Sequence, residues 1–315
     1  MRMARLAAVA SACLMAAASL LAPGQQAFGA STPQGGFPVR VPDGWGGSVV
    51  ISHRPDRIIS LSPTATEMLF AIGAGHQVIA VDNDSDYPPQ APRTSLSGYT
   101  PNVEAIAGYR PDLVVIAYNP HGLAAALARL HIPTLMLGAP ANLSGTYSQI
   151  EELGIATGDR VGAARLVASM RAQVARLVAE APRPPKPLTY YYELDYNPYY
   201  TVTPDTFIGS LLKMVGLVDI DTSTKAGAYP EISAEAILAA DPDLIFLADT
   251  GPDGAQTPAT VSARPGWQVI TAVRHHWIFA LNPDIASRWG PRTVDLLRAV
   301  VEDMREVVAE ERHAA

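Results

Sequence analysis

Cysteine and positive charge are both scarce in this sequence. The 315 residues include a single cysteine, Cys13, which lies in a stretch that we expect to be removed on export. Without it the remaining chain can form no disulfide bond, no cysteine-ligated zinc site and no cysteine nucleophile. The 23 Lys and Arg residues are scattered along the chain and are outnumbered by 30 Asp and Glu residues. We therefore expect no nucleic-acid partner, because no basic stripe is available to neutralise a phosphate backbone.

Motifs that carry catalysis or bind metal ions are missing as well. The chain has neither a Gly-x-Ser-x-Gly nucleophile turn nor a His-Glu-x-x-His zinc motif. Asp82, Asp84 and Asp86 have the spacing that opens a calcium loop. However, Tyr87 and Arg93 occupy the positions where that loop needs glycine and glutamate. We therefore expect no enzyme, no catalytic residue, no cofactor and no metal site built from the protein's own side chains.

The composition is that of a globular protein. Hydrophobic residues make up 48% of the chain and charged residues 17%. The 24 glycines and 27 prolines follow no period, which excludes a collagen-like chain, and the apolar fraction is too high for a disordered one. The length is sufficient for two lobes, each with its own core.

The first 29 residues have the pattern of a secretory signal peptide. Arg2 and Arg5 precede an uncharged run rich in Ala and Leu from Leu6 to Ala22, and Ala27-Phe28-Gly29 is an acceptable cleavage site. We expect cleavage after Gly29 and a location in the periplasm or at the outer face of the cytoplasmic membrane. An uncleaved membrane anchor and a lipoprotein modified at Cys13 are the alternatives.

Strand-like and helix-like segments alternate along the rest of the chain, which is typical of an α/β fold. A leader with a small hairpin is expected over 30–55, and an N-terminal lobe over 56–158. Apolar residues recur every three to four positions over 159–181, and this pattern predicts one long connecting helix. Four prolines between Pro182 and Pro187 end it, so we expect a C-terminal lobe over 182–315.

An internal repeat is the most informative feature of the sequence. Residues 102–117 match residues 233–248 at one constant offset. Each copy has a Glu near its start, an Ala-Ile pair, and a Pro-Asp step before an aliphatic run. The glutamates are Glu104 and Glu235. Pro-Asp before aliphatic residues is also common between helix and strand. The coincidence of all three features nevertheless favours two duplicated lobes.

Several motifs in order resemble those of one family. They are the export signal, the hairpin, Arg57 to Glu67, Ser85-Asp86-Tyr87-Pro88, the repeat, and Asp284 to Arg292. Together they resemble the class III periplasmic substrate-binding proteins of cobalamin and ferric-siderophore ABC importers, over nearly all of the chain from Val39 to Val308. The resemblance implies an α/β fold of two three-layer lobes with central, mostly parallel sheets joined by one long α-helix. It also implies a ligand between the lobes.

The resemblance further implies partners and roles for particular residues. The partners would be a dimeric ABC permease with its ATPase and a small metal chelate, whose cobalt or iron belongs to the ligand, and the protein itself would be monomeric. Glu104 and Glu235 would dock on the permease, one from each lobe. As an alternative, each is only a first-turn acid favoured by the helix dipole. Asp284, Arg288 and Trp289 would face the ligand from the second lobe, unless Asp284 and Arg288 form an internal pair that shapes their loop.

Tyrosines are expected to supply most of the contact area with a large planar chelate. The candidates are the loop residues Tyr99, Tyr118, Tyr196, Tyr199 and Tyr200. Cobalamin and a ferric siderophore remain open as ligands, with haem as a third choice. Asp84 stands where several corrinoid binders carry an aromatic residue, which counts against cobalamin. A two-lobed exported enzyme and a ligand-sensing receptor subunit remain alternative functions.

Overall fold

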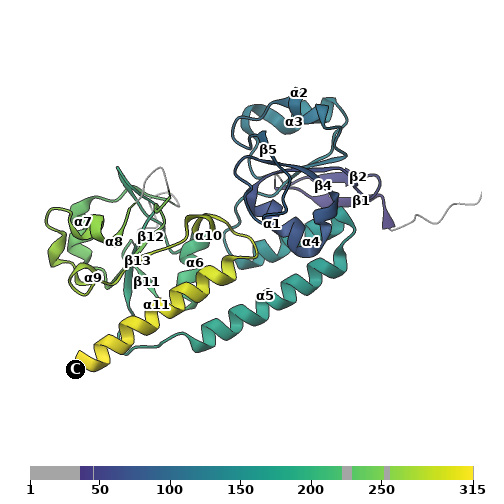
Figure 1. The fold of residues 1–315 in the computed structure, drawn as a ribbon. Helices are drawn as coiled ribbons and strands as arrows, with labels where there is room; N and C mark the ends of the chain where they lie inside the picture. The colour runs from purple at the N-terminus through teal and green to yellow at the C-terminus, as the bar shows by residue number, and fades with distance from the viewer. Residues whose placement is uncertain (1–35, 45, 222–228, 252–255, 315) are drawn as a thin grey trace, which may run out of the picture. The chain divides into compact units, whose positions relative to one another are not determined.

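The computed structural model describes residues 36–44, 46–221, 229–251 and 256–314. The predicted signal peptide, its cleavage site and Cys13 lie outside the described residues. Figure 1 shows the elements in chain order. Within the described part, no helix has both the length and the apolar character needed to cross a membrane.

The N-terminal lobe is built on a parallel sheet of five strands in the order β5-β4-β3-β6-β7. The strands are β3 (Ile58–Leu61), β4 (Val78–Asp82), β5 (Arg93–Leu96), β6 (Leu113–Ile116) and β7 (Thr134–Met136). Neighbouring residues of a strand belong to different cores, since Ile58 packs in one hydrophobic cluster and Ile59 in another. The sheet is therefore covered on both faces, as parallel sheets usually are.

Three of the helices of this lobe lie between its strands in the chain, and the fourth, α4 (Leu143–Thr157), leads from β7 to the long helix α5 (Arg160–Glu180). The other three are α1 (Pro63–Ile72), α2 (Val103–Gly108) and α3 (Leu123–Arg129), with short 3₁₀ turns at Ala74–Gln77 and Pro120–Gly122. The predicted hairpin precedes them as antiparallel strands β1 (Val39–Pro42) and β2 (Ser48–Ile51). Helix α4 was not predicted, because Gly145 and Gly154 interrupt its sequence pattern.

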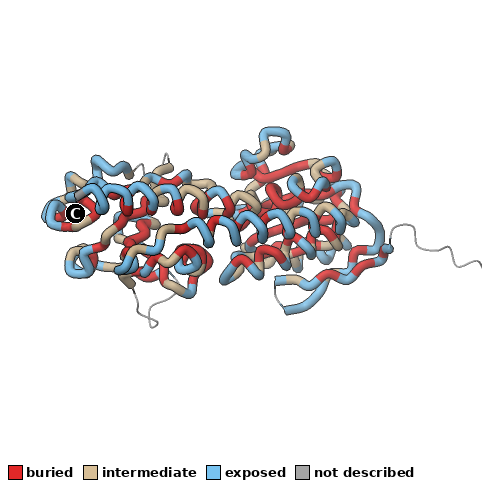
Figure 2. Tube along the Cα trace, turned by 90° about the horizontal axis from the view of Figure 1, so that it is seen from below, coloured by how far each residue is buried: buried red, intermediate tan, exposed pale blue. Residues whose placement is uncertain are grey.

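A single long helix, α5 (Arg160–Glu180), occupies the segment in which the sequence predicts the connecting helix. It buries Ala163, Val167, Met170, Val174 and Leu177, at alternating steps of four and three residues. Its other faces are exposed, as the alternating colours along the helix in Figure 2 show. This periodicity is why the sequence alone defined the helix to within one residue at each end.

The C-terminal lobe contains a second parallel sheet, with four strands in the order β11-β8-β12-β13. The strands are β8 (Thr189–Glu193), β11 (Val218–Asp219), β12 (Leu244–Leu247) and β13 (Ile278–Ala280). A separate two-stranded hairpin, β9 (Asp195–Tyr196) and β10 (Tyr199–Tyr200), follows β8. The predicted fold class, two α/β lobes with parallel sheets, is confirmed.

The side chains of β8 show how this second sheet is buried. Tyr190 and Tyr192 pack in one hydrophobic cluster and Tyr191 in another, and all three side chains are at most 1% exposed. The alternation expected for a strand is confirmed, and all three tyrosines belong to the core. The Tyr190 hydroxyl donates a hydrogen bond of 2.8 Å to Asp219, which satisfies it in this apolar setting.

The remaining helices surround this sheet. They are α6 (Phe207–Met214), α7 (Ala234–Ala240), α8 (Pro258–Ser262), α9 (Thr271–Arg274), α10 (Pro283–Ser287) and α11 (Thr293–Ala314), with a 3₁₀ turn at Trp267–Val269. Helix α11 contacts α5, since the Arg305 guanidinium lies 3.1 Å from the Glu180 carboxylate. The two helices share one hydrophobic core, to which α11 contributes Val300, Met304 and Val307.

The sequence repeat corresponds to a repeated structure. In each lobe the Asp of the Pro-Asp step accepts hydrogen bonds from the backbone at the start of the neighbouring parallel strand. Asp112 accepts from the amide of Arg57 at 3.0 Å, before β3, and Asp243 accepts from the amide of Thr189 at 2.8 Å, in β8. Because backbone donors at a strand end otherwise lack partners, this contact explains why Asp occurs in both copies.

Candidate functional site

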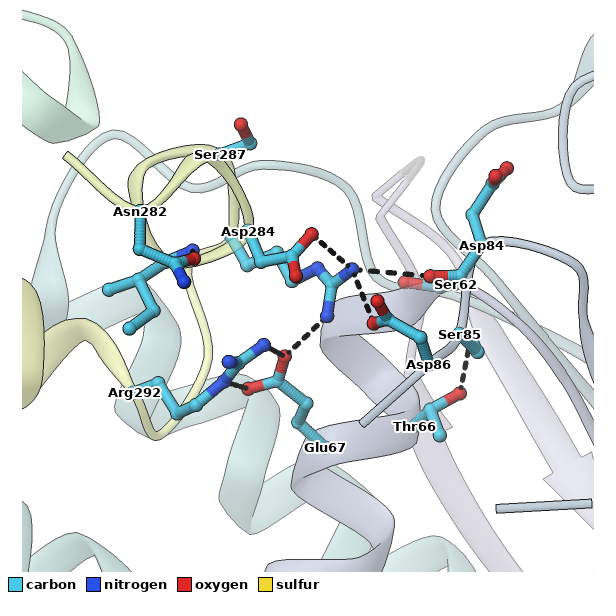
Figure 3. Close-up of polar contacts among 12 residues, drawn as sticks. Ser62, Thr66, Glu67, Asp84, Ser85, Asp86, Asn282, Asp284, Ser287 and Arg292 are labelled. Carbon is cyan, nitrogen blue, oxygen red and sulfur yellow. Dashed lines mark hydrogen bonds and ion pairs between the residues drawn. The ribbon is translucent and has the colours of Figure 1, made fainter. Parts of the chain in front are cut away.

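A cluster of charged side chains joins the start of the first lobe to the end of the second. Arg288, at the end of α10, contacts three carboxylates: Glu67 at 3.0 Å, Asp86 at 2.9 Å and Asp284 at 2.9 Å. It also donates to the backbone carbonyl of Asp84. Figure 3 shows Asp86 and Asp284 converging on this guanidinium. The residues Asp284 and Arg288 therefore form an internal pair, and the pair extends to the first lobe.

Glu67 lies at the centre of this cluster. Its side chain is 1% exposed, and it accepts hydrogen bonds from Arg288 and two from Arg292, at 3.0 and 2.6 Å. The hydrogen bond to Glu67 raises the pKa of Arg292 and outweighs desolvation, which lowers it. The Arg292 guanidinium lies 4.2 Å from the ring centre of Tyr87. Two cations around one buried carboxylate satisfy the requirement that buried charges be paired.

Helix α1 positions Glu67 through its N-terminal cap. Ser62 has an extended backbone and its side chain accepts from the amide of Ala65, while Pro63 occupies the first helical position. One turn later Thr66 donates to Ser60 at 2.9 Å and lies 2.9 Å from the hydroxyl of Ser85. This buried hydroxyl chain ties α1 to the loop after β4, which carries Asp84 and Asp86.

Asp82 is the last residue of β4 and is buried beside the hydroxyl groups of Thr66 and Ser85. Burial raises its pKa to about 6, and the charge of Asp84 adds to this effect, while the Ser85 hydrogen bond opposes it. The Oδ1 atom of Asp82 has no hydrogen-bond partner among the described residues. The loop thus brings three acidic residues, Asp82, Asp84 and Asp86, close to the charged cluster.

A pocket of about 230 Å³ is lined by residues from both lobes. The first lobe contributes Ser62, Pro63, Thr64, Asp84, Tyr99, Ala117 and Tyr118, and the second contributes Pro283, Asp284, Ser287, Arg288 and Trp289. Five of the eight residues predicted to bind ligand therefore line one pocket: Tyr99, Tyr118, Asp284, Arg288 and Trp289. A larger hollow of about 560 Å³ between α1, α5 and the start of α11 contains none of them.

Tyr99 and Tyr118 form an exposed aromatic pair at this pocket. Their ring centres are 5.6 Å apart with an angle of 27° between the planes, and the residues are 63% and 49% exposed. Burial, followed by the neighbouring Tyr118 and Asp84, raises the pKa of Tyr99. Tyr229 from the second lobe is 49% exposed, and burial followed by Tyr118 raises its pKa.

The second-lobe tyrosines of the predicted site lie elsewhere. Tyr196, Tyr199 and Tyr200 belong to the β9–β10 hairpin, and none of them lines the 230 Å³ pocket. Tyr199 packs on Trp267 with ring centres 5.6 Å apart, and Arg264 lies 5.3 Å from the Tyr199 ring. Arg264 is held in turn by the fully buried Glu193 through contacts of 2.6 and 2.7 Å.

Trp289 has a structural contact in addition to its place in the pocket wall. The residue is 9% exposed, its indole N–H donates to Gln149 at 3.0 Å, and its carbonyl accepts from Thr146 at 3.0 Å. Both partners lie on α4 of the first lobe. Trp289 therefore fixes the loop that carries Arg288, and only part of its ring is available to a ligand.

The predicted docking residues occupy equivalent places in the two lobes. Glu104 and Glu235 are exposed and are the second residues of α2 and α7. Each helix begins with a side-chain cap: Asn102 accepts from Ala105, and Ser233 accepts from Ala236. The glutamates are thus presented to solvent at the first turn, where the helix dipole favours an acid.

The predicted site residues did not include Glu67, Asp84 and Asp86, which the structure places in the pocket lining or in the charged cluster behind it. The signal for Glu67 was a lone acid on the apolar face of a predicted helix, since such a residue is buried only with a partner. The chain has two α/β lobes with parallel sheets, and residues of both lobes line a pocket. These features define the class of protein, which is a two-lobed binding protein.

Comparison with known proteins identifies the family. Residues 58–285 match the family model described as "Periplasmic binding protein". The chain belongs to this family. A protein of Halobacterium salinarum named "Cobalamin-binding protein" is 30% identical over 93% of this chain and 82% of its own length. A Bacillus subtilis "Uncharacterized ABC transporter substrate-binding lipoprotein" is 29% identical over 85% of this chain and 86% of its own.

A solved structure has the same fold. The periplasmic vitamin B12-binding protein of Vibrio cholerae superposes with a TM-score of 0.67 and 27% identity, covering 80% of this chain and 97% of that one. The predicted membership in the binding-protein family is confirmed by these matches.

Proposed function

We propose that the protein is the extracytoplasmic substrate-binding component of an ABC importer, and that its ligand is a metal chelate of the corrinoid type. The observation that carries this proposal is the pocket lined by Tyr99 and Tyr118 from one lobe and by Asp284 and Arg288 from the other. The names of the cobalamin-binding and vitamin B12-binding relatives favour a corrinoid over a ferric siderophore or haem.

The pocket geometry suits the edge of a large planar ligand. A corrinoid exceeds 230 Å³, so the pocket holds one edge of it, and the rest of the ring system lies against the exposed tyrosines. Aromatic side chains provide large contact areas for planar ligands at a low entropic cost. The side chain of Asp284 is 39% exposed and can accept hydrogen bonds from ligand amides as well as from Arg288.

The hairpin tyrosines extend the proposed binding surface on the second lobe. Tyr196 is 43% exposed and Tyr200 is 37% exposed, so both can contact a ligand larger than the pocket. Tyr199 has the supporting role, since it is packed on Trp267 and under Arg264. In this arrangement Trp289 contacts the ligand with the exposed part of its ring and holds the loop with the rest.

Glu104 and Glu235 are proposed to dock the two lobes on a two-fold permease that works with an ATPase. Both are exposed, and both follow a capped helix start with an extended N-cap backbone. A protein with two equivalent acids can meet two equivalent basic pockets, and such charge pairs mainly fix orientation and encounter rate. An N-terminal signal peptide over residues 1–29 would export the protein to the outer side of the cytoplasmic membrane, where the permease lies. The exported protein is proposed to be a monomer.

The binding proposal is tested by titrating the purified protein with cyanocobalamin and a set of ferric siderophores, using calorimetry and intrinsic fluorescence. We expect saturable binding of cyanocobalamin, weakened at least about tenfold by replacing both Tyr99 and Tyr118 with Ala, because their stacking area is lost. The control is Val161→Ala, which removes a 73% exposed side chain on α5. Binding of an iron chelate alone would overturn the corrinoid assignment, and no binding would overturn the transport proposal.

The docking proposal needs a second experiment, because it concerns transport and not affinity. Reversing both charges, Glu104→Arg with Glu235→Arg, should abolish uptake in cells while the affinity for ligand stays unchanged. The control reverses two exposed acids elsewhere, Glu151→Arg with Glu311→Arg. Normal uptake by the first double variant, or an equal loss in the control, would contradict the assigned role.

A further inference from the structure

The charged residues that line the pocket are mostly acidic. Asp84, Asp284 and Arg288 are the charged members of its lining within the described residues. Glu67, Asp86 and Arg292 stand immediately behind them in the ion-pair cluster. Four carboxylates therefore surround two guanidiniums, and the described part of the pocket has a negative formal balance.

The positive charge of Arg288 is not available to a ligand. Its side chain is 9% exposed, and carboxylates contact both terminal nitrogens, Glu67 at Nη1 and Asp86 and Asp284 at Nη2. Arg292 is engaged by the same Glu67 through two hydrogen bonds. An anionic ligand would have to displace these contacts and leave a buried carboxylate without its partner, which is costly.

Asp84 differs from the other carboxylates because no cation of the described chain pairs with it. Its nearest side-chain donor there is the amide of Asn83, at 3.4 Å. Figure 3 shows its carboxylate pointing away from the guanidinium cluster. The residue is exposed and lines the pocket together with Tyr99 and Tyr118. It also contributes to the raised pKa of Tyr99, after burial and Tyr118, so the carboxylate lies near that ring.

A carboxylate beside stacked aromatic rings has a defined chemical preference. The faces of tyrosine rings attract cations, and a carboxylate accepts hydrogen bonds from N–H groups and attracts positive charge. Both features repel an anion. The negative charge of Asp84 and Asp284 therefore acts in the same direction as the aromatic faces of Tyr99 and Tyr118.

We propose that the pocket selects its chelate by charge. It takes neutral or cationic chelates whose N–H donors face Asp84 and Asp284, and it rejects chelates that present carboxylates or catecholates. Asp84 is the specificity-determining residue, because no cation of the described chain compensates its charge. This inference rests on the proposed function, since it concerns the ligand of the same pocket. Within the metal chelates it favours amide-bearing corrinoids and hydroxamate chelates over triply charged catecholates and over haem with its two propionates.

The test compares ligands that differ in charge and hardly in shape. Cyanocobalamin is neutral, and its monocarboxylic acids carry one carboxylate in place of a side-chain amide. We expect each acid to bind at least about tenfold more weakly than cyanocobalamin at pH 7.5, because one added charge near two carboxylates costs on this order. The neutral cyclic ferrioxamine E and the cationic ferrioxamine B, each compared with an anionic ferric catecholate, provide the same comparison for iron chelates.

A variant of Asp84 tests whether this residue causes the discrimination between neutral and anionic ligands. Asp84→Asn removes the charge and keeps the size, so it should reduce the discrimination between neutral and anionic forms at least about threefold. Asp56→Asn, an exposed acid outside the pocket, is the control. Equal or tighter binding of the anionic forms, or unchanged discrimination in Asp84→Asn, would overturn the charge rule and leave the proposed function standing. Binding of none of the chelates would overturn both.

Discussion

Glu67 and Arg292 form a two-point ion pair between positions 225 residues apart in the chain. The Glu67 side chain is 1% exposed and that of Arg292 is 16% exposed, and Arg288 adds a third hydrogen bond to the same carboxylate. A buried ion pair of this kind is weak evidence for net stability, since desolvation offsets much of the attraction. Removing one partner is different, because the remaining charges stay buried without compensation.

Replacing Glu67 with Gln should therefore lower the free energy of unfolding by about 3 kcal/mol, measured by urea denaturation. The amide keeps the shape but cannot neutralise Arg288 and Arg292. The control is Arg176→Gln, which breaks an exposed pair with Glu180 within α5 and should leave stability essentially unchanged. A Glu67→Gln protein as stable as the original would show that the cluster contributes only orientation.

The repeated aspartates make a second prediction. Asp112→Ala and Asp243→Ala each leave backbone donors at a strand start without an acceptor, so each should cost about 1–2 kcal/mol of stability. The two costs should add in the double variant to within about 0.5 kcal/mol, because the residues serve different sheets. Asp56→Ala is the matched control, since its carboxylate has no partner among the described residues. Clearly unequal effects at the two sites would argue against an equivalent role.

The sequence predicted those features that depend on short-range patterns. The apolar periodicity of α5 placed the helix to within a residue, and the repeat located two equivalent strands and their Pro-Asp turns. It also predicted five of the pocket residues, Asp284, Arg288 and Trp289 through a family motif and Tyr99 and Tyr118 as aromatic residues of loops. These signals lie within a few residues of one another, so local periodicity and propensity are enough to detect them.

Contacts between distant segments could not be predicted in this way. Glu67 contacts Arg288 and Arg292 only when both lobes are folded. The sequence does not indicate which acidic residue forms ion pairs with these arginines. The hairpin tyrosines show the reverse case. Their proximity in sequence suggested that they share one site with the other candidates, but none of them lines the 230 Å³ pocket.

A close approach of two helices leads to the third prediction. A Cβ atom added at Gly162, in the first turn of α5, would lie 1.8 Å from the carbonyl oxygen of Ile72 at the end of α1. Gly162→Ala must therefore push the helices apart and should cost about 2–4 kcal/mol, although Ala is the better helix former. Gly108→Ala at the end of α2 is the control, because its added Cβ meets nothing within 4 Å. Equal thermal midpoints for the two variants would contradict the close contact.

The last prediction concerns Asp249, which follows β12 near the buried Glu193. Both of its carboxylate oxygens lack a hydrogen-bond partner among the described residues. Burial, followed by the charge of Glu193, raises the pKa of Asp249 to about 7, while Arg264 opposes the shift. A carboxyl group whose folded-state pKa is raised stabilises the fold at low pH, and this contribution is lost as the pH rises from the unfolded-state pKa near 4 to the folded-state value.

Asp249→Asn should therefore be more stable than the original protein at pH 8, by roughly 1–2 kcal/mol after allowance for solvent screening. The difference should shrink as the pH falls below 7 and vanish only below the unfolded-state pKa near 4, where the wild-type carboxyl is protonated in both states. Urea denaturation at pH 4.5, 6 and 8 measures this difference directly. Asp82 and Asp219, whose pKa values burial also raises to about 6, are present in both proteins and cancel from the comparison. A stability difference that is constant from pH 4.5 to 8 would show that Asp249 does not titrate in this range, and a destabilised variant at pH 8 would show that its carboxylate has a favourable partner.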